Sequence, residues 1–219
     1  PEKFDSLFAC RPEGIDGRTT EGKKELSKFR LSSIGKEGLT QEQLTKAKAM
    51  AAACFNEPCT AELLNDPTAK KQLTIYWDEP DYGTYNKLRL DLFIPRPDQE
   101  TDLILDLKTS DDPTPENWAR GGAFSPIVKF QYDLQLAYYA MGVQRHTGRL
   151  SSTGLIVVGS AEPHDVYLYS TGGWLELGTL KCKAALDLLV HCRTTGDWKR
   201  PDQGGVIELE PTKWDYDSE

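Results

Sequence analysis

Two neighbouring segments in which apolar and charged side chains alternate constrain the fold of this chain most. In residues 86–95 leucines alternate with charged residues that include Asp91, and in residues 101–109 Asp106 and Lys108 stand among leucine and isoleucine. Successive side chains of a β-strand point to opposite faces of a sheet, so each segment predicts a strand with a charged face and an uninterrupted apolar face. The intervening PRPDQE is typical of a turn, and we expect the two strands to pair as a hairpin.

The rest of the chain predicts helices and further strands around this hairpin. A capping-box pattern at Thr40 and Gln43 predicts a helix that ends at Pro58. The prolines and glycines of residues 110–126 predict a long loop, and such loops are often functional. The other expected elements are a short helix over 60–64, a strand over 72–77, a helix over 129–144, strands over 153–159 and 165–170, a helix over 175–192 and a strand over 206–209. This order predicts one α/β domain.

Composition limits the class of protein. The chain has 219 residues, 38% of them hydrophobic, and 34 acidic against 26 basic residues give a formal net charge of −8. It is long enough to bury a sizeable core, and it lacks the run of about 18 apolar residues that a membrane span needs. Five cysteines without a C-x-x-C pair indicate free thiols in a reducing compartment. The acidic balance argues against a protein that coats nucleic acid indiscriminately, but it permits a local basic groove.

Asp91, Asp106 and Lys108 form the candidate chemical site. If the two strands pair with their charged faces aligned, two carboxylates and an ammonium converge. Mg²⁺ is usually bound by one or two carboxylates together with waters and phosphate oxygens, and a lysine can then orient or deprotonate the attacking water. The set therefore predicts metal-assisted hydrolysis of a phosphodiester. The alternative is a solvated face of an edge hairpin, because a D-x-K motif by itself is short.

Five longer stretches surround this motif: NEPCTAELL, IYWDEPDYGTYNKLRLDLF, LILDLKTSDDPTPENW, QYDLQLAYYA and GDWKRP. With these stretches, the chain from about residue 47 to residue 198 resembles the PD-(D/E)xK nuclease superfamily, and within it the RecE-type exonuclease (exodeoxyribonuclease VIII) branch. The resemblance implies an α/β fold with a restriction-endonuclease-like core, a central mixed β-sheet flanked by helices in αβββαβ order. We expect this nuclease domain over residues 39–219, after a polar arm over residues 1–38.

The resemblance also implies roles for single residues. The expected metal ligands are Glu57, Asp91, Asp106 and the main-chain carbonyl of Leu107. The expected catalytic residues are Asp91, Asp106, Lys108, Gln135 and Tyr139, the last two being four residues apart on one helix face. The expected DNA contacts are Lys87, Arg89, Thr109, Ser110 and Tyr132. Structural alternatives stay open: an exposed helix end for Glu57, core packing for Tyr132, strand-end hydrogen bonds for Thr109 and Ser110, and pairing with the aspartates for Lys87 and Arg89.

The activity that the resemblance implies is a Mg²⁺-dependent DNA exonuclease, with Mn²⁺ able to substitute and without an iron–sulfur cluster. It would degrade one strand, 5′→3′, from linear double-stranded DNA ends, so that a RecT-type single-strand annealing protein can load for recombination. We expect a homo-oligomeric ring, no membrane attachment, and a cytoplasmic, bacterial or phage-encoded protein. Two alternatives remain: a catalytically weak module that binds DNA or a partner, because Gln72 stands where the family usually has glutamate, and a metal-dependent endonuclease.

Overall fold

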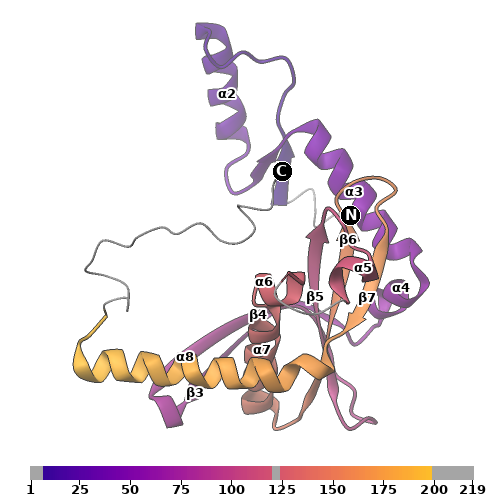
Figure 1. The fold of residues 1–219 in the computed structure, drawn as a ribbon. Helices are drawn as coiled ribbons and strands as arrows, with labels where there is room; N and C mark the ends of the chain where they lie inside the picture. Colours follow the sequence, from indigo (N-terminus) through magenta and orange to yellow (C-terminus); the bar gives the residue numbers. More distant parts are fainter. Residues whose placement is uncertain (1–6, 120–123, 199–219) are drawn as a thin grey trace, which may run out of the picture.

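A five-stranded sheet forms the centre of the computed structural model, which describes residues 7–119 and 124–198 (Figure 1). The strands lie side by side in the order β3 (Lys70–Glu79), β4 (Thr84–Ile94), β5 (Asp102–Ser110), β6 (Ser151–Gly159) and β7 (Val166–Ser170). β5 and β6 run parallel, whereas the other neighbours are antiparallel. The predicted β4–β5 hairpin and the mixed character of the sheet are therefore confirmed.

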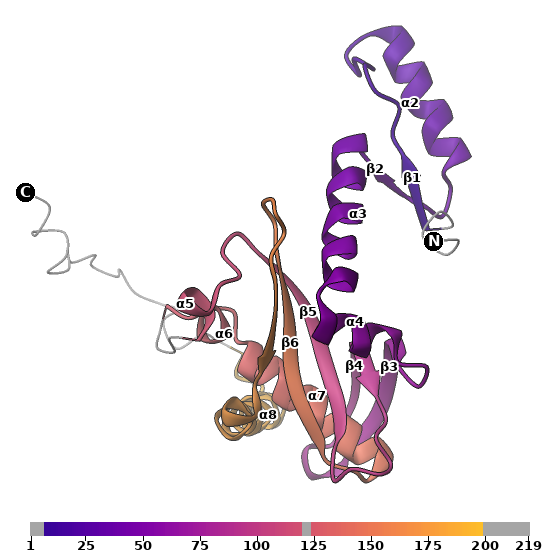
Figure 2. The same cartoon turned by 90° about the vertical axis from the view of Figure 1, so that its right-hand side faces the viewer.

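Two pairs of helices lie on opposite faces of this sheet (Figure 2). α3 (Gln41–Asn56) and α4 (Pro58–Asn65) cover one face, and α7 (Tyr132–Thr147) and α8 (Leu175–Thr195) lie on the other. The short elements are α5 (Pro115–Trp118), α6 (Pro126–Lys129), and the 3₁₀ turns η1 (Pro80–Tyr82) and η2 (Gly172–Trp174). Each face of the sheet thus has its own apolar core.

Local sequence signals set most of the helix boundaries. The expected capping box is present, because the Thr40 side chain accepts from the Gln43 main chain and the Gln43 side chain accepts from the Thr40 main chain. α7 begins later than the pattern predicted, because Gln131 adopts a left-handed φ of 58° that separates it from α6. The loop expected over residues 110–126 contains α5 and the start of α6. The strand expected over residues 206–209 lies outside the described residues.

Apolar residues of β4 change face at Asp91. Leu88 and Leu90 pack in the core beside α7, whereas Leu92 packs in the core beside α3 and α4. The prediction of an uninterrupted leucine face is therefore wrong beyond Asp91. Across from Asp91, Gln72 of β3 has a φ of 54°, a left-handed conformation that residues other than glycine rarely adopt. Both strands twist here, so that side chains on either side of this point face opposite sides of the sheet. The alternation of residues along one strand does not reveal such a break.

Residues 7–39 form a small unit at the start of α3, seen at the top of Figures 1 and 2. β1 (Phe8–Cys10) and β2 (Glu37–Leu39) pair in parallel, and α2 (Thr20–Ser32) connects them. The polar arm that the sequence predicted thus contains regular structure. It has almost no core, since Gly22 and Ser33 are the only residues of the unit that are buried.

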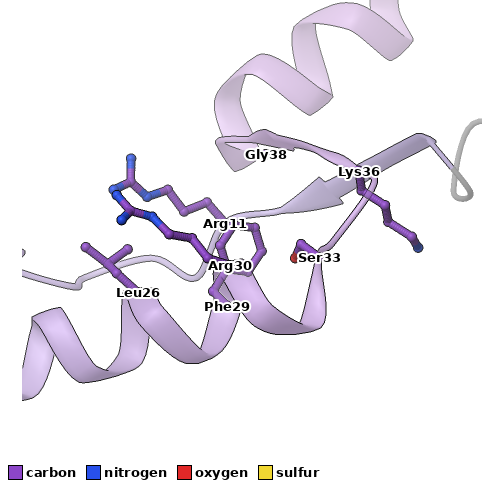
Figure 3. A pocket seen from close by; sticks show the side chains of 7 residues that line it. All are labelled: Arg11, Leu26, Phe29, Arg30, Ser33, Lys36 and Gly38. Carbon is purple, nitrogen blue, oxygen red and sulfur yellow. The ribbon is translucent and has the colours of Figure 1, made fainter.

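A pocket of about 300 Å³ opens on this unit between α2 and the two short strands. Figure 3 shows the guanidinium groups of Arg11 and Arg30 side by side at one end of it. Neither arginine takes part in an ion pair within the described residues. The acidic chain therefore carries a local positive patch here.

The remaining expectations about the chain's class concern thiols and membranes. All five cysteines are free, as the odd count and their spacing predicted. Among the described residues, no helix combines the length and apolar character that crossing a membrane requires.

Candidate active site

Asp106 and Lys108 lie on the face of β5 that α7 covers. Lys108 Nζ is 2.5 Å from Asp106 Oδ2 and donates a hydrogen bond of 3.1 Å to Gln135 Oε1. Gln135 Nε2 in turn donates to Asp106 Oδ1 at 3.3 Å and to the Tyr139 hydroxyl at 2.8 Å. Four of the expected catalytic residues, from a strand and a helix far apart in sequence, therefore form one hydrogen-bonded network.

Asp91 reaches this network from the point where β4 and β5 separate. Main-chain pairing between the two strands covers only Leu92–Ile94 and Leu103–Leu105. Beyond these pairs a side chain links the two strands, because Asp91 Oδ2 accepts a hydrogen bond from the Leu107 main-chain N–H at 3.0 Å. Its other oxygen, Oδ1, accepts from Gln72 Nε2 at 2.8 Å. Gln72, which stands where the family usually has glutamate, is therefore hydrogen-bonded directly to a candidate metal ligand.

The electrostatics of Asp106 follow from its burial. The residue is 3% exposed, and this burial raises the pKa of its carboxyl above the ordinary value. Lys108 acts in the opposite direction through its hydrogen bond and charge, while the negative charge of nearby Asp91 raises the pKa further. The charge of Asp91 thus disfavours ionisation of the buried Asp106 carboxyl, and a cation bound beside these two side chains would relieve that cost.

A divalent metal ion fits this donor set. Asp106 Oδ2 is buried, and the Lys108 ammonium lies 2.5 Å from it, so this oxygen is held at a fixed position beside Asp91. Mg²⁺ prefers hard oxygen ligands and retains several waters, so Asp91, Asp106 and the Leu107 carbonyl could hold it. In the described part of the chain, no three His, Cys, Asp or Glu side chains are grouped closely enough to form a metal site. The other coordination positions would therefore fall to water and phosphate oxygens.

Glu57 lies apart from these residues. It is the N-cap of α4, and its Oε2 accepts from the Thr60 main-chain N–H at 2.7 Å, which lowers the pKa of Glu57. It lines a pocket with Glu162 and His164 near the β6–β7 turn, whereas Asp91 lines a different pocket. The structure does not bring this expected ligand to the two aspartates, and its role in metal binding stays a prediction.

Tyr132 covers the Lys108 ammonium, whose Nζ lies 4.4 Å from the centre of the ring. Trp118 of α5 is stacked with Tyr132, with ring centres 6.0 Å apart, and with Tyr169 of β7, with ring centres 5.9 Å apart. With 7% exposure, Trp118 is a packed part of the wall and supports Tyr132. Sequence reasoning did not give Trp118 a role in placing Tyr132. The signal in the sequence was a loop in which aromatic and basic residues alternate, and that pattern suits either stacking on a DNA strand end or a loop packed by its own tryptophan.

The remaining expected DNA contacts divide into two groups. The Ser110 hydroxyl makes hydrogen bonds within the loop: it donates to the Asp112 carbonyl at 2.8 Å and accepts from Trp118 Nε1 at 3.3 Å. Its structural alternative thus has support, whereas Thr109 is exposed. Lys87 and Arg89 are exposed on β4, on the face opposite α7, and no described ion pair joins them to the aspartates.

A comparison with known families matches residues 7–211 to the PDDEXK-like domain of unknown function (DUF3799). The chain belongs to this family. The expected relationship to the PD-(D/E)xK superfamily is thereby confirmed, and the mixed sheet between its two helical layers is the restriction-endonuclease-like core of a PDDEXK-like domain.

Solved structures add support at the level of the fold. A crystal structure of a protein from Eubacterium rectale, provisionally named an exonuclease, is similar to this PDDEXK-like chain with a TM-score of 0.57 and 15% identity, over 90% of this chain and 74% of that one. The structure of SSO0001 matches with a TM-score of 0.34 and 13% identity, over 68% of this chain and 63% of that one, which is too weak to support any conclusion. No curated protein matches the sequence.

Proposed function

We propose that this PDDEXK-like protein is a metal-dependent deoxyribonuclease. The convergence of Asp91, Asp106 and Lys108 carries the proposal, because the buried Asp106 carboxylate lies beside a second carboxylate and has the Lys108 ammonium 2.5 Å from its Oδ2. A solvated face of an edge hairpin would expose its charges, whereas Asp106 is 3% exposed. Burying a carboxylate beside a second one costs stability, and such an arrangement is typical of functional sites. The name of the Eubacterium rectale protein agrees with a nuclease.

The chain's own residues would act on a phosphodiester through position and charge. When bound, a divalent cation would polarise a phosphate oxygen and lower the pKa of a bound water. Gln135 holds the Lys108 ammonium and the Asp106 carboxylate in fixed relative positions through its amide. Lys108 can then donate to the attacking water or to a phosphate oxygen, and Tyr132 restricts its movement from one side.

We propose that the activity is exonucleolytic, uses Mg²⁺ and starts from linear double-stranded DNA ends. A 5′→3′ direction, a ring of identical subunits and cooperation with an annealing protein belong to the same proposal and rest on the sequence resemblance. Labelling either the 5′ or the 3′ end of a duplex would test the direction. The mass of the native protein in solution would test the ring.

The decisive experiment is digestion of linear and covalently closed circular duplex DNA with Mg²⁺. We expect loss of the linear DNA alone, abolished by EDTA, and a decrease of about a hundredfold or more in Lys108→Ala. Lys183→Ala, at an exposed position of α8, is the matched control and should retain activity. Equal nicking of circles would indicate an endonuclease, and absence of metal-dependent cleavage would refute the nuclease.

One observation favours the weaker alternative, a binding module with little activity. Gln72 Nε2 donates to Asp91 Oδ1, so this oxygen already has a protein partner. Gln72→Glu would replace that donor with a third carboxylate and should strengthen Mn²⁺ binding in calorimetry. If Gln72→Glu gains cleavage that the natural chain lacks, the module interpretation is favoured. Equal cleavage by both proteins would show that Gln72 does not limit activity.

A further inference from the structure

An exposed aromatic and basic surface lies on the face of β3 and β4 opposite α7. The residues of this surface are Thr74 and Tyr76 on β3, and Tyr85, Lys87 and Arg89 on β4. Their neighbours along each strand point the other way into the core beside α7, where Leu88 is 3% exposed and Leu90 is fully buried. In Figure 2, α3 and α4 stand beside the upper part of the sheet, and the lower part of β3 and β4 carries no helix on that side.

Two tyrosines dominate this surface. The rings of Tyr76 and Tyr85 are stacked, with centres 6.0 Å apart and planes 13° from parallel. They are nevertheless 50% and 71% exposed, although such rings are usually buried or in contact with a partner. Lys87 Nζ lies 5.5 Å from the centre of the Tyr76 ring, so a cation lies directly beside the aromatic pair.

The surface runs along β4 toward Asp91, on the face of the sheet opposite the one on which α7 covers Asp106 and Lys108. In the pairing of β3 with β4, Arg89 lies across from Thr74 and Lys87 lies across from Tyr76. Asp91 stands two residues after Arg89 on β4. Two residues of a strand advance about 7 Å, so Arg89 and Lys87 stand at about 7 and 14 Å along β4 from Asp91. No ion pair in the described residues occupies either cation. Two cations without an ion pair in the described residues therefore lie along β4 between Asp91 and Tyr85, and Lys87 stands beside Tyr76.

We propose that this surface binds a single strand of nucleic acid along β4, on the side from which it reaches Asp91. Tyr76 and Tyr85 would stack with its bases, and Lys87 and Arg89 would contact its phosphates. Ring faces can stack only on unpaired bases, because the bases of a duplex are already stacked within the helix. The inference rests on the proposed nuclease function and deepens it, since it identifies a single-stranded segment as the substrate portion held beside the site.

The test measures binding of a fluorescent oligothymidine to the natural chain in EDTA, by anisotropy. The double substitution Tyr76→Ile/Tyr85→Ile removes both rings while it retains residues that suit a strand. We expect it to weaken binding roughly tenfold or more, since base–aromatic stacking contributes strongly in single-strand complexes. Tyr76→Phe/Tyr85→Phe keeps the rings and should bind normally. Leu188→Ala, at an exposed apolar position of α8, should also bind normally.

Two further readouts separate stacking from charge. Lys87→Gln/Arg89→Gln should reduce the slope of log affinity against log salt by about 1.4, whereas the isoleucine pair should leave that slope unchanged. A blunt duplex should bind the isoleucine pair as it binds the natural chain. Circular dichroism would confirm that each variant is folded. Unchanged oligothymidine binding by the isoleucine pair, or an equal loss for blunt duplex, would overturn the proposal.

Failure of this proposal can be distinguished from failure of the proposed function. The binding assay contains no metal and requires no cleavage, so it reports on the surface alone. Ring-independent binding together with Mg²⁺-dependent digestion would reject the surface and keep the nuclease. Ring-dependent binding without digestion under any metal would keep the surface and reject the nuclease.

Discussion

The ion pair between Asp133 and Lys181 provides a sharp test of how α7 is held in place. Asp133 lies in the first turn of α7, two residues before Gln135, and its side chain is fully buried. Lys181 of α8 places its Nζ 2.5 Å from Asp133 Oδ2, while Oδ1 has no hydrogen-bond partner within the described residues. Lys181→Met would therefore leave a buried carboxylate without its counterion.

The magnitude follows from the burial of the two partners. Breaking a buried ion pair by removing one partner costs about 3–5 kcal/mol of unfolding free energy. The Lys181 side chain is 27% exposed, so water can reach part of the vacated space and the lower end, about 3 kcal/mol, is expected. For a chain of this size, that loss corresponds to a decrease of roughly 6–12 °C in Tm.

Urea unfolding followed by tryptophan fluorescence would measure the loss, with Lys183→Met on the same helix as the matched control. Adding Asp133→Asn to Lys181→Met removes the stranded charge and should recover more than half of the stability. A double-mutant cycle over the two positions should give a coupling free energy above about 1 kcal/mol. If Lys181→Met costs no more than Lys183→Met, or if Asp133→Asn fails to recover stability, this pair does not fix α7 to α8.

Three further outcomes are expected. Gly142→Ala should lower the unfolding free energy by about 1–3 kcal/mol in urea, because the new Cβ would lie 2.4 Å from Leu88 Cδ2 where α7 crosses β4; an unchanged midpoint would contradict this packing. Mn²⁺ at about ten times its Kd should raise Tm by roughly 3–6 °C. Asp106→Asn should abolish that shift, and a shift retained in the variant would place the metal elsewhere. Burial raises the pKa of the Cys182 thiol to about 11, so iodoacetamide at pH 8 should label exposed Cys10 and leave Cys182 unmodified, as mass spectrometry of peptides would show; labelling of both at similar rates would refute the burial.

Local patterns predicted most of the elements, because each depends on neighbours within one or two turns of chain. The capping box at Thr40, the proline after α3 and the alternation of β4 and β5 are signals of this kind. The four-residue spacing of Gln135 and Tyr139 predicted a shared helix face, and their side chains are hydrogen-bonded in the structure. The sequence patterns did not predict the β1–α2–β2 unit, because its residues bury almost no apolar surface and give little periodicity.

The face of the sheet to which a side chain points could not be derived from one segment of sequence where two strands separate. The alternation of β4 continues in the letters of the sequence, yet its leucines enter different cores on either side of Asp91. This change depends on Gln72 in the adjacent strand and on the helices that press on opposite faces of the sheet. Glu57 shows a related limitation: the family resemblance implied a metal ligand there, and only the structure shows that its carboxylate caps α4 away from the two aspartates.

The sequence by itself determined the residue types of the site and the elements that carry them: two aspartates and a lysine on neighbouring strands, and a glutamine on a helix. Tertiary structure alone decided that Gln135 joins Lys108 to Asp106, that Gln72 holds Asp91, and that Trp118 supports Tyr132. The physical reason is range. Periodicity and capping act between residues a few positions apart, whereas these contacts join elements that meet only when the sheet packs against α7 and the loop before it.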